Sequence, residues 1–339
     1  MEHDSIVGLD IAKSIFQVHR TDPSGQVVEC RKLRRGALLK YFAALPASLV
    51  GLEACASAHH WGREIAALGH EVRLIAPSYV KPYVQRQKND AADAAAIAEA
   101  VSRPHMRFVP VKSVARQAAL MLHRCRELLI KQRTMTINAL RAHLAELGIV
   151  SAKGRDGVAA LIAHVEGNGD AGTGALDALA HVALCGLVAQ LRGLQGEIGA
   201  LDRRISAWHR ANEGSRHLAS IAGIGVLSAS TLVATLGDGS AFASGRQLSA
   251  WLGLVPRQSS SGGHDRLGGI TKQGDPYLRR LLVIGATSVL KRAQTAARAM
   301  PREQGQARIR GPRNCCGASP TVWPQWRSPT EPLASSGRC

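Results

Sequence analysis

Aromatic residues are scarce in this 339-residue chain, and acidic residues are outnumbered. Phe, Trp and Tyr make up only 4% of the sequence, so stacking of bases on aromatic rings cannot dominate any contact with nucleic acid. Lys and Arg number 43 against 25 Asp and Glu, which gives a formal net charge of +18. Such an excess favours a polyanionic partner, and nucleic acid contacted mainly through its phosphates is the best match.

The sequence also lacks the usual marks of a membrane, disulfide-stabilised or zinc-binding protein. We find no apolar run long enough to span a bilayer and no short apolar segment behind a basic N-terminus. The seven cysteines are scattered without a CxxC spacing, which indicates reduced thiols in the cytoplasm. The histidines form no HExxH motif, and the adjacent pair His59 and His60 is expected to mark a loop.

The length predicts two domains, and the first hundred residues alternate strand and helix patterns. Residues 5–18 are predicted to form a central strand followed by its hairpin partner. Further strands are predicted at 26–33, 48–53 and 71–75, and helices at 36–45, 61–68 and 88–100. The order predicts an α/β fold with a mixed sheet of about five strands, covered by helices and carrying functional groups at the strand ends.

Carboxylates stand at positions where they are costly unless a cation is near. Asp10 ends the apolar run IVGLD and Glu53 ends SLVGLE, so two predicted strands deliver an acid at matching ends. A buried carboxylate must be paired or neutralised, and a turn is the weaker explanation for Asp10. Asp90 and Asp93 share one face of the helix KNDAADAAAIAEA. Taken alone, Asp90 would be a helix cap and Asp93 a solvated residue, and the pair is a cost to the helix unless a cation lies near it.

The middle of the chain is predicted to be helical. Residues 112–149 form one or two long amphipathic helices, 151–174 a loose glycine-rich connection, and 175–209 a helical run that returns antiparallel. Arg124 and Arg133 belong to the basic face of the first run. Such a face is solvated, or it contacts nucleic acid or a second subunit.

Two further stretches carry possible phosphate contacts. Gly223 and Gly225 are expected to form a tight turn ahead of a helix, either as in helix-hairpin-helix modules or as a plain turn. Residues 256–280 are expected to form a polar, flexible loop leading into a helix. GGITK is not a P-loop, because its lysine does not directly follow a glycine and no strand is predicted before it. The basic residues predicted to contact nucleic acid there are Arg257, Arg266, Lys272, Arg279 and Arg280.

Four motifs, in their order and spacing, resemble the DEDD transposases related to the Piv DNA invertase, which are insertion-sequence recombinases guided by a bridge RNA. The motifs are IVGLD, VGLEACASAHHW, VKPYVQRQKNDAADAAAIAEA and LVPRQSSSGGHDRLGGITKQGDPYLRRLL, within residues 5–292. The resemblance implies a RuvC-like, ribonuclease-H-type domain at 1–110, a helical linker and oligomerisation region at 111–210, and a mainly helical transposase domain at 211–295. Residues 296–339 depart from the pattern and are expected to be a disordered or aberrant tail.

The same resemblance implies the chemistry. Asp10, Glu53, Asp90 and Asp93 would bind Mg²⁺ or Mn²⁺, and Ser261, with Ser260 as the alternative, would attack a DNA phosphodiester. The implied partners are DNA, a guide RNA and further copies of the chain in a dimer or tetramer, in the bacterial cytoplasm. Two other functions stay open: a nucleic-acid-binding remnant without catalysis, and a metal-dependent junction nuclease that forms no covalent intermediate.

Overall fold

The computed structural model describes residues 3–84, 89–167 and 176–299, and it divides the chain into two compact units. The first unit contains residues up to 221 together with 225–241, and the second contains 222–224 and the chain from 242 onward. Each unit is described by itself below. The predicted tail lies outside the described residues from position 300 onward, as does Lys88 in the predicted acidic helix.

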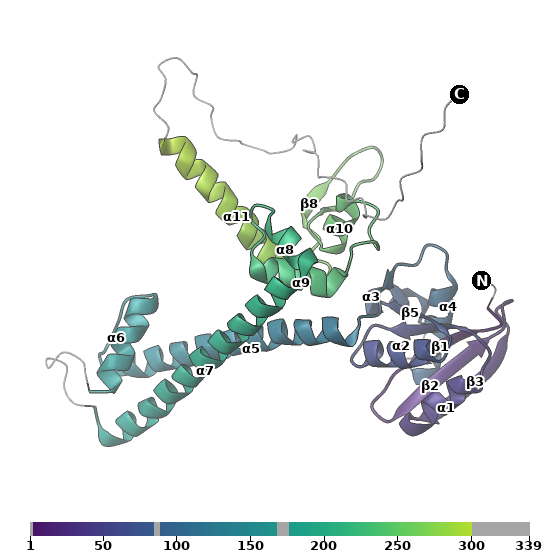
Figure 1. The fold of residues 1–339 in the computed structure, drawn as a ribbon, viewed down its shortest axis with the longest axis horizontal. Coiled ribbons are helices and arrows are strands. Elements are labelled where there is room, and N and C mark those ends of the chain that lie inside the picture. The colour runs from purple at the N-terminus through teal and green to yellow at the C-terminus, as the bar shows by residue number, and fades with distance from the viewer. Residues whose placement is uncertain (1–2, 85–88, 168–175, 300–339) are drawn as a thin grey trace, which may run out of the picture. The chain divides into compact units, whose positions relative to one another are not determined.

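A mixed sheet of six strands is the centre of the first unit, in the order β3-β2-β1-β4-β5-β6 (Figure 1). The strands are β1 (Ile6–Asp10), β2 (Ile15–Thr21), β3 (Val27–Arg34), β4 (Leu49–Glu53), β5 (Glu71–Ile75) and β6 (Phe108–Val109). Strands β1, β4 and β5 are parallel, and the other three pair antiparallel. The prediction of five strands missed β6, because two residues are too few to show a periodic pattern.

Helices cover both faces of this sheet. Helices α1 (Leu38–Ala43) and α2 (Ala58–Ala67) pack against Val7, Leu9, Val50 and Leu52 on one face. Helix α4 (Asp90–Ser102) packs against the other face, and the short helix α3 (Pro77–Val80) lies beside it. The 3-10 turns η1 (Arg35–Ala37) and η2 (Lys81–Tyr83) complete this part of the chain. The prediction of a loop at His59 and His60 is wrong, since both lie in the first turn of α2.

Two glycines allow α4 to approach the sheet closely. Gly8 and Gly51 are register partners in β1 and β4, and both point toward α4. A Cβ atom on Gly8 would lie 2.1 Å from the carbonyl oxygen of Ala94, and one on Gly51 would lie 2.8 Å from the Cβ of Val101. Both distances are shorter than real contacts, so glycine in the strands and alanine in the helix bring the two backbones together.

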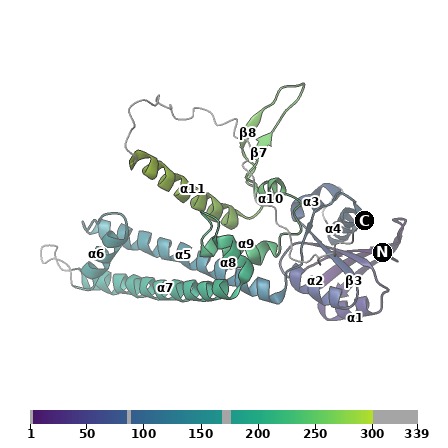
Figure 2. The same cartoon turned by 45° about the horizontal axis from the view of Figure 1, so that its top comes forward.

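The remaining helices of the first unit form a second core. They are α5 (Val114–Glu146), α6 (Arg155–Val165), α7 (Ala178–Ala211), α8 (Glu213–Ala219) and α9 (Val226–Leu236). Figures 1 and 2 show α5 and α7 side by side. They run antiparallel as predicted, because Arg126 near the start of α5 pairs with Asp202 near the end of α7, while Leu144 shares a core with Leu184. The predicted loose connection at 151–174 is wrong for α6, whose Leu161 and Val165 are buried in that same core.

Helix α7 also corrects the expectation that no stretch could span a membrane. By length and composition alone, Ala178–Ala211 meets that criterion, and it is the one helix that does so among the described residues. Its apolar side chains at Leu184, Val188, Leu191, Ile198 and Ile205 are buried within the unit. A core helix that packs against other helices passes the same test of composition.

A buried histidine joins α5 to α9. The ring of His123 is 2% exposed, with Nε2 3.1 Å from the hydroxyl of Ser230 and Nδ1 3.2 Å from that of Thr231. Burial and, to a smaller extent, the nearby charges of Arg126 and Arg124 together lower the pKa of His123 from 6.5 to about 4, against an opposite effect of Asp202. The ring is therefore neutral in the folded protein at neutral pH.

Acid is expected to weaken the first unit through His123. In the unfolded chain the imidazole of His123 binds a proton below about pH 6.5, whereas in the folded chain it stays neutral down to about pH 4. The free energy of unfolding should therefore fall with decreasing pH across this window, by about 1.4 kcal/mol per pH unit for one histidine. Urea unfolding of wild type and His123→Gln at several pH values tests this. In His123→Gln the free energy of unfolding should depend less on pH between 4 and 6.5, because the contribution of this histidine is gone. In His60→Gln, at an exposed position, the dependence should equal that of wild type.

The second unit contains α10 (Gly245–Trp251), a hairpin of β7 (Pro256–Gln258) and β8 (Leu267–Ile270), and α11 (Pro276–Ala299). The prediction of a flexible loop at 256–280 is wrong for the part of the segment that forms this hairpin, because β7 and β8 pair with each other (Figure 2). Gly223 adopts a φ of +88°, and its carbonyl oxygen would lie 1.9 Å from a Cβ on Gly285 of α11. A helix thus packs directly against this turn, which favours the plain-turn alternative.

Candidate functional site

Asp10 and Glu53 end neighbouring parallel strands. Leu9 of β1 is the register partner of Leu52 in β4, so the next residue on each strand is an acid at the same edge of the sheet. Side chains alternate between the two faces of a strand, which places Asp10 with Gly8, and Glu53 with Gly51, on the face that α4 covers. The matching strand ends expected from the sequence are therefore present, while the chemical roles of these acids stay predictions.

Asp90 and Asp93 occupy the first turn of α4 on the same side of the sheet. The helix begins with Asn89, whose Oδ1 accepts a hydrogen bond of 2.8 Å from the amide of Ala92. The interpretation of Asp90 as the capping residue is therefore wrong, and its carboxylate is not used for capping. Ala94 contacts β1 at Gly8, two residues before Asp10, so the turn that precedes Ala94 reaches the end of the strand where Asp10 lies.

Three of the acids lie near enough to Asp10 for their charges to act on it. Burial raises the pKa of Asp10 above its usual value, and the charges of Asp93, Asp90 and Glu53 raise it further. The amide of Ile11 donates a hydrogen bond that partly opposes this. Within the described ranges, Asp10 has no ion pair with a Lys, Arg or His side chain. Repulsion among carboxylates is therefore not offset by a described cation at Asp10.

The donor set suits a hard divalent cation. Carboxylate oxygens are the ligands that Mg²⁺ and Mn²⁺ prefer, and an ion would relieve the repulsion at Asp10. In the described part of the chain, no three His, Cys, Asp or Glu side chains already stand close enough to hold a metal. The carboxylates would have to move together to share one ion. The chemistry of the residues fits a metal site, and their side-chain positions fit one only after such movement.

Sequence reasoning missed one polar residue at this site. Gln17 in β2 is the register partner of Asp10 and is only 6% exposed. Its Oε1 is buried without a hydrogen-bond partner among the described atoms, which is costly for an amide oxygen. An amide within the apolar strand IFQV was the available signal. Gln17 adds one more oxygen beside the acids.

The predicted nucleophile lies at the tip of the β7–β8 hairpin in the second unit. Ser261 pairs with His264 across Gly262 and Gly263, whose φ values of +58° and +78° are those of a tight hairpin turn. The hydroxyl of Ser260 accepts a hydrogen bond of 3.0 Å from Gln258 within the hairpin. The exposed hydroxyl of Ser261 has no hydrogen-bond partner among the described residues. This difference favours Ser261 over Ser260 as an attacking group.

The predicted nucleic-acid contacts lie in different surroundings. Arg257, Arg266 and Lys272 are exposed on or beside the hairpin. Arg279 is bound within the unit, because its guanidinium donates a 2.9 Å hydrogen bond to the carbonyl of Leu252. Arg280 lies over the ring of Tyr277, with 5.3 Å between the guanidinium carbon and the ring centroid.

The remaining two predicted contacts, Arg124 and Arg133, are on α5. This helix belongs to the first unit, which also contains the four acids. Arg124 forms an ion pair with Glu127, and Arg133 is half-buried. All seven contacts stay predictions, and only the exposed ones present their full charge to a partner.

Comparison with known proteins gives matches over most of the chain. A family model described as "Transposase", of the IS110 DEDD type, matches residues 7–149, and one described as "Transposase IS116/IS110/IS902 family" matches residues 215–301. A "Probable family 20 transposase" of Pseudomonas aeruginosa is 47% identical over 85% of this chain and 84% of its own length. A "Putative transposase y4pF/y4sB" of Sinorhizobium fredii is 45% identical, over 85% and 73%. The "Transposase for insertion sequence element IS1111A" of Coxiella burnetii is 39% identical, over 86% and 79%.

Proposed function

This chain belongs to the IS110/IS116 family of DEDD transposases, and on that premise we propose that it cuts and exchanges DNA strands of an insertion sequence. In this proposal Asp10, Glu53, Asp90 and Asp93 hold Mg²⁺ or Mn²⁺, and Ser261 is the nucleophile. The observation that carries the proposal is the gathering of four carboxylates from β1, β4 and α4 on one face of the sheet, where their charges act on Asp10.

In this proposal the first unit supplies the metal-binding acids and the second unit supplies the nucleophile. The hydroxyl oxygen of Ser261 attacks the phosphorus of a DNA phosphodiester, so that an oxygen–phosphorus bond to serine forms and the bond to one deoxyribose oxygen breaks. The departing oxygen takes up a proton, and the serine hydroxyl gives one up. When bound, a divalent ion would supply positive charge for the attacking and leaving oxygens. The exposed hairpin tip presents the hydroxyl without a competing hydrogen bond.

The reaction also requires contact between the serine and the acids. Burial and the neighbouring acids raise the pKa of Asp10 in the metal-free protein, and a bound divalent ion would lower it again, because the cation favours the charged carboxylate. The attack requires the hairpin of the same chain, or of a second copy, to meet the acids when DNA is bound.

We include in the proposal a structured guide RNA and a dimeric or tetrameric assembly. Both rest on the resemblance of the four sequence motifs, and the net charge of +18 supports a partner rich in phosphate. The basic helix α5 with Arg124 and Arg133 is one part of the first unit that we expect to contact nucleic acid or a neighbouring subunit.

Covalent trapping tests the proposed function. Full-length protein incubated with labelled insertion-sequence end DNA and Mn²⁺ should give a protein–DNA adduct that survives denaturing electrophoresis. Ser261→Ala should abolish the adduct, and Ser260→Ala, the matched neighbour, should keep it. The reverse pattern would move the role to Ser260. Cleavage without an adduct would instead indicate a junction nuclease, and binding alone would indicate an inactive remnant.

A further inference from the structure

A row of side chains runs across the sheet from the acids to its outer edge. Asp10 of β1 is the register partner of Gln17 in β2, and Gln17 is in turn the register partner of Lys32 in β3. Direct partners in antiparallel strands project from the same face. Asp10, Gln17 and Lys32 therefore follow one another on the face that α4 covers only in part.

Beyond α4 this face is open. On β3 the alternate residues Cys30, Lys32 and Arg34 share it, and all three are exposed. The thiol of Cys30 lies 3.2 Å from Nδ1 of His19, its register partner, which confirms that these two side chains point the same way. We call the face made by His19, Cys30, Lys32 and Arg34 the β2–β3 face.

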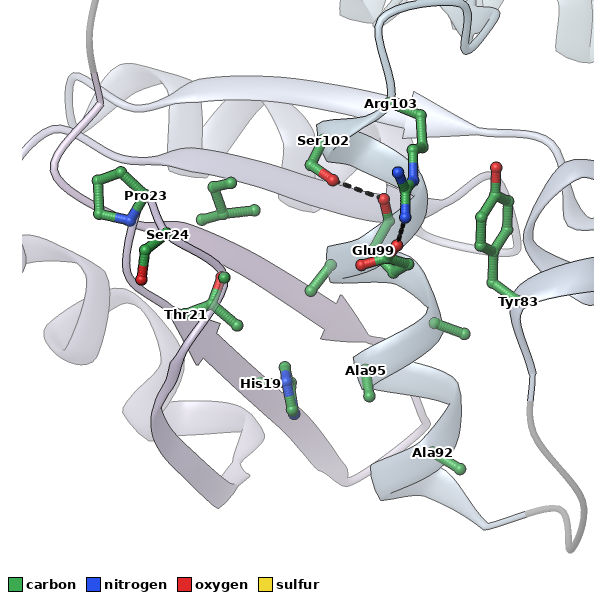
Figure 3. A pocket seen from close by; sticks show the side chains of 14 residues that line it. His19, Thr21, Pro23, Ser24, Tyr83, Ala92, Ala95, Glu99, Ser102 and Arg103 are labelled. Atoms are coloured by element: carbon green, nitrogen blue, oxygen red, sulfur yellow. Dashed lines mark hydrogen bonds and ion pairs between the residues drawn. The ribbon is translucent and has the colours of Figure 1, made fainter.

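A groove of about 620 Å³ separates the β2–β3 face from α4. His19 and Thr21 line it from β2, and Ala92, Ala95 and Glu99 line it from the helix (Figure 3). The alanines add no charge to the helix side of the groove, and the charged residues Glu99 and Arg103 follow further along α4. Glu99 is paired with Arg103 one turn along the helix, so its carboxylate is neutralised. From His19 the groove runs toward Ile6 and Thr21, at the end of β1 away from Asp10, and Glu99 is the acidic residue in its lining.

The positive charges of this face are available to a ligand. Neither Lys32 nor Arg34 forms an ion pair with an acid in the described ranges of the chain. Arg31, which precedes Lys32 on β3, projects to the opposite face and is paired with Glu29. The cations on the two faces of the strand therefore differ in whether an acid is paired with them. The two cations without a partner are those that share a face with Asp10.

We infer that the β2–β3 face is a binding site for the phosphate backbone of the DNA strand that the acids cut. Lys32 and Arg34 contact successive phosphates beside the scissile one, and the groove next to His19 accommodates the sugar edge of the strand. This inference rests on the proposed function for the choice of DNA and names where the substrate lies. Charge complementarity carries it, because a strand placed at the acids continues over the basic residues of the same face.

Salt dependence of DNA binding tests the assignment. Fluorescence anisotropy with a short labelled duplex gives log Kd against log salt concentration, and each phosphate contact contributes about 0.9 to the slope. Lys32→Gln and Arg34→Gln should each lower the slope by about 0.9. Lys40→Gln is the matched control, because Lys40 is exposed on α1, which covers the opposite face. Its slope should equal that of wild type. A decrease of the slope in Lys40→Gln as large as the decrease in Lys32→Gln would overturn the assignment.

Thiol protection gives a second readout that needs no substitution. Alkylation of Cys30 in the full-length protein, followed by peptide mass spectrometry, should slow severalfold when the duplex is added, relative to Cys185 on α7. An unchanged rate at Cys30 would contradict the inference. Neither readout requires cleavage. Protection of Cys30 without a covalent adduct would therefore overturn the proposed function and support the binding site. A covalent adduct without protection of Cys30 would support the proposed function and overturn the binding site.

Discussion

Asp10→Asn is expected to reduce DNA cleavage and adduct formation by about a thousandfold or more, because it removes a carboxylate ligand from the proposed metal site. The same change should make the metal-free protein more stable. Asp10 ends a buried strand, its pKa is raised by burial and by Asp93, Asp90 and Glu53, and no described cation is paired with it. Asparagine keeps the shape and removes the repelling charge. A loss of activity together with a gain in melting temperature would identify Asp10 as a carboxylate that is needed for metal binding and not for the stability of the fold.

The pH dependence of this gain has a definite sign. A carboxyl group whose pKa is higher in the folded state than in the unfolded state lowers stability above both values, and the loss disappears as pH falls below the unfolded value of 3.8. The advantage of Asp10→Asn should thus be full at neutral pH and shrink in acid. Mn²⁺ should raise the melting temperature of wild type and of the control Asp4→Asn, an exposed site, but not of Asp10→Asn. Equal metal stabilisation of all three would contradict the assignment.

Gly8→Ala is expected to destabilise the first unit by about 3 kcal/mol or more, although it adds a single methyl group to a strand. The added carbon would lie 2.1 Å from the carbonyl oxygen of Ala94, which is backbone and cannot rotate away. Helix α4 must move, and Asp90 and Asp93 move with it. Chemical unfolding measures the loss of stability. Activity under conditions where the variant remains folded measures the effect on the site.

Two further glycine variants calibrate that result. Gly51→Ala places its carbon 2.8 Å from the Cβ of Val101, a less severe overlap than the 2.1 Å at Gly8, so it should cost less than Gly8→Ala. Gly186→Ala lies at an exposed position in α7 with no atom within 4 Å of the new carbon. It should stabilise the helix by about 0.5–1 kcal/mol. If Gly8→Ala were as harmless as Gly186→Ala, the close packing of α4 on β1 would be contradicted.

The acidic half of the site could be predicted because its signals are local. IVGLD and VGLE each show a short apolar run with an acid at its end, and parallel pairing of similar strands brings those ends together. The alanine-rich composition predicted the helix that carries Asp90 and Asp93, and their spacing predicted that they share one face. Their grouping with Asp10 and Glu53 came from the resemblance of the four motifs. The need for glycine at Gly8 and Gly51 depends on a helix more than 40 residues away in sequence, and no local pattern reports it.

Other elements escaped prediction because their stability comes from distant contacts. Strand β6 is two residues long and forms only against β5. Helix α6 stands among glycines that suggested a loop, and the burial of Leu161 and Val165 against α5 and α7 overrides that preference. The β7–β8 hairpin was hidden by serines and glycines, although its turn at Gly262 and Gly263 is one that glycine favours. The unpaired oxygen of Gln17 became visible only with the register of β2.

Strand β3 has one more consequence, for self-association of the protein. It is the outer strand of the sheet, and such an edge offers free backbone groups to which an identical strand can pair. Charged side chains at Arg31, Lys32 and Arg34 repel the same residues on an approaching copy. A nucleic acid bound over this edge would remove that repulsion while also covering the face beside it. The same cations would thus keep separate molecules from aggregating through their sheets before the DNA is found.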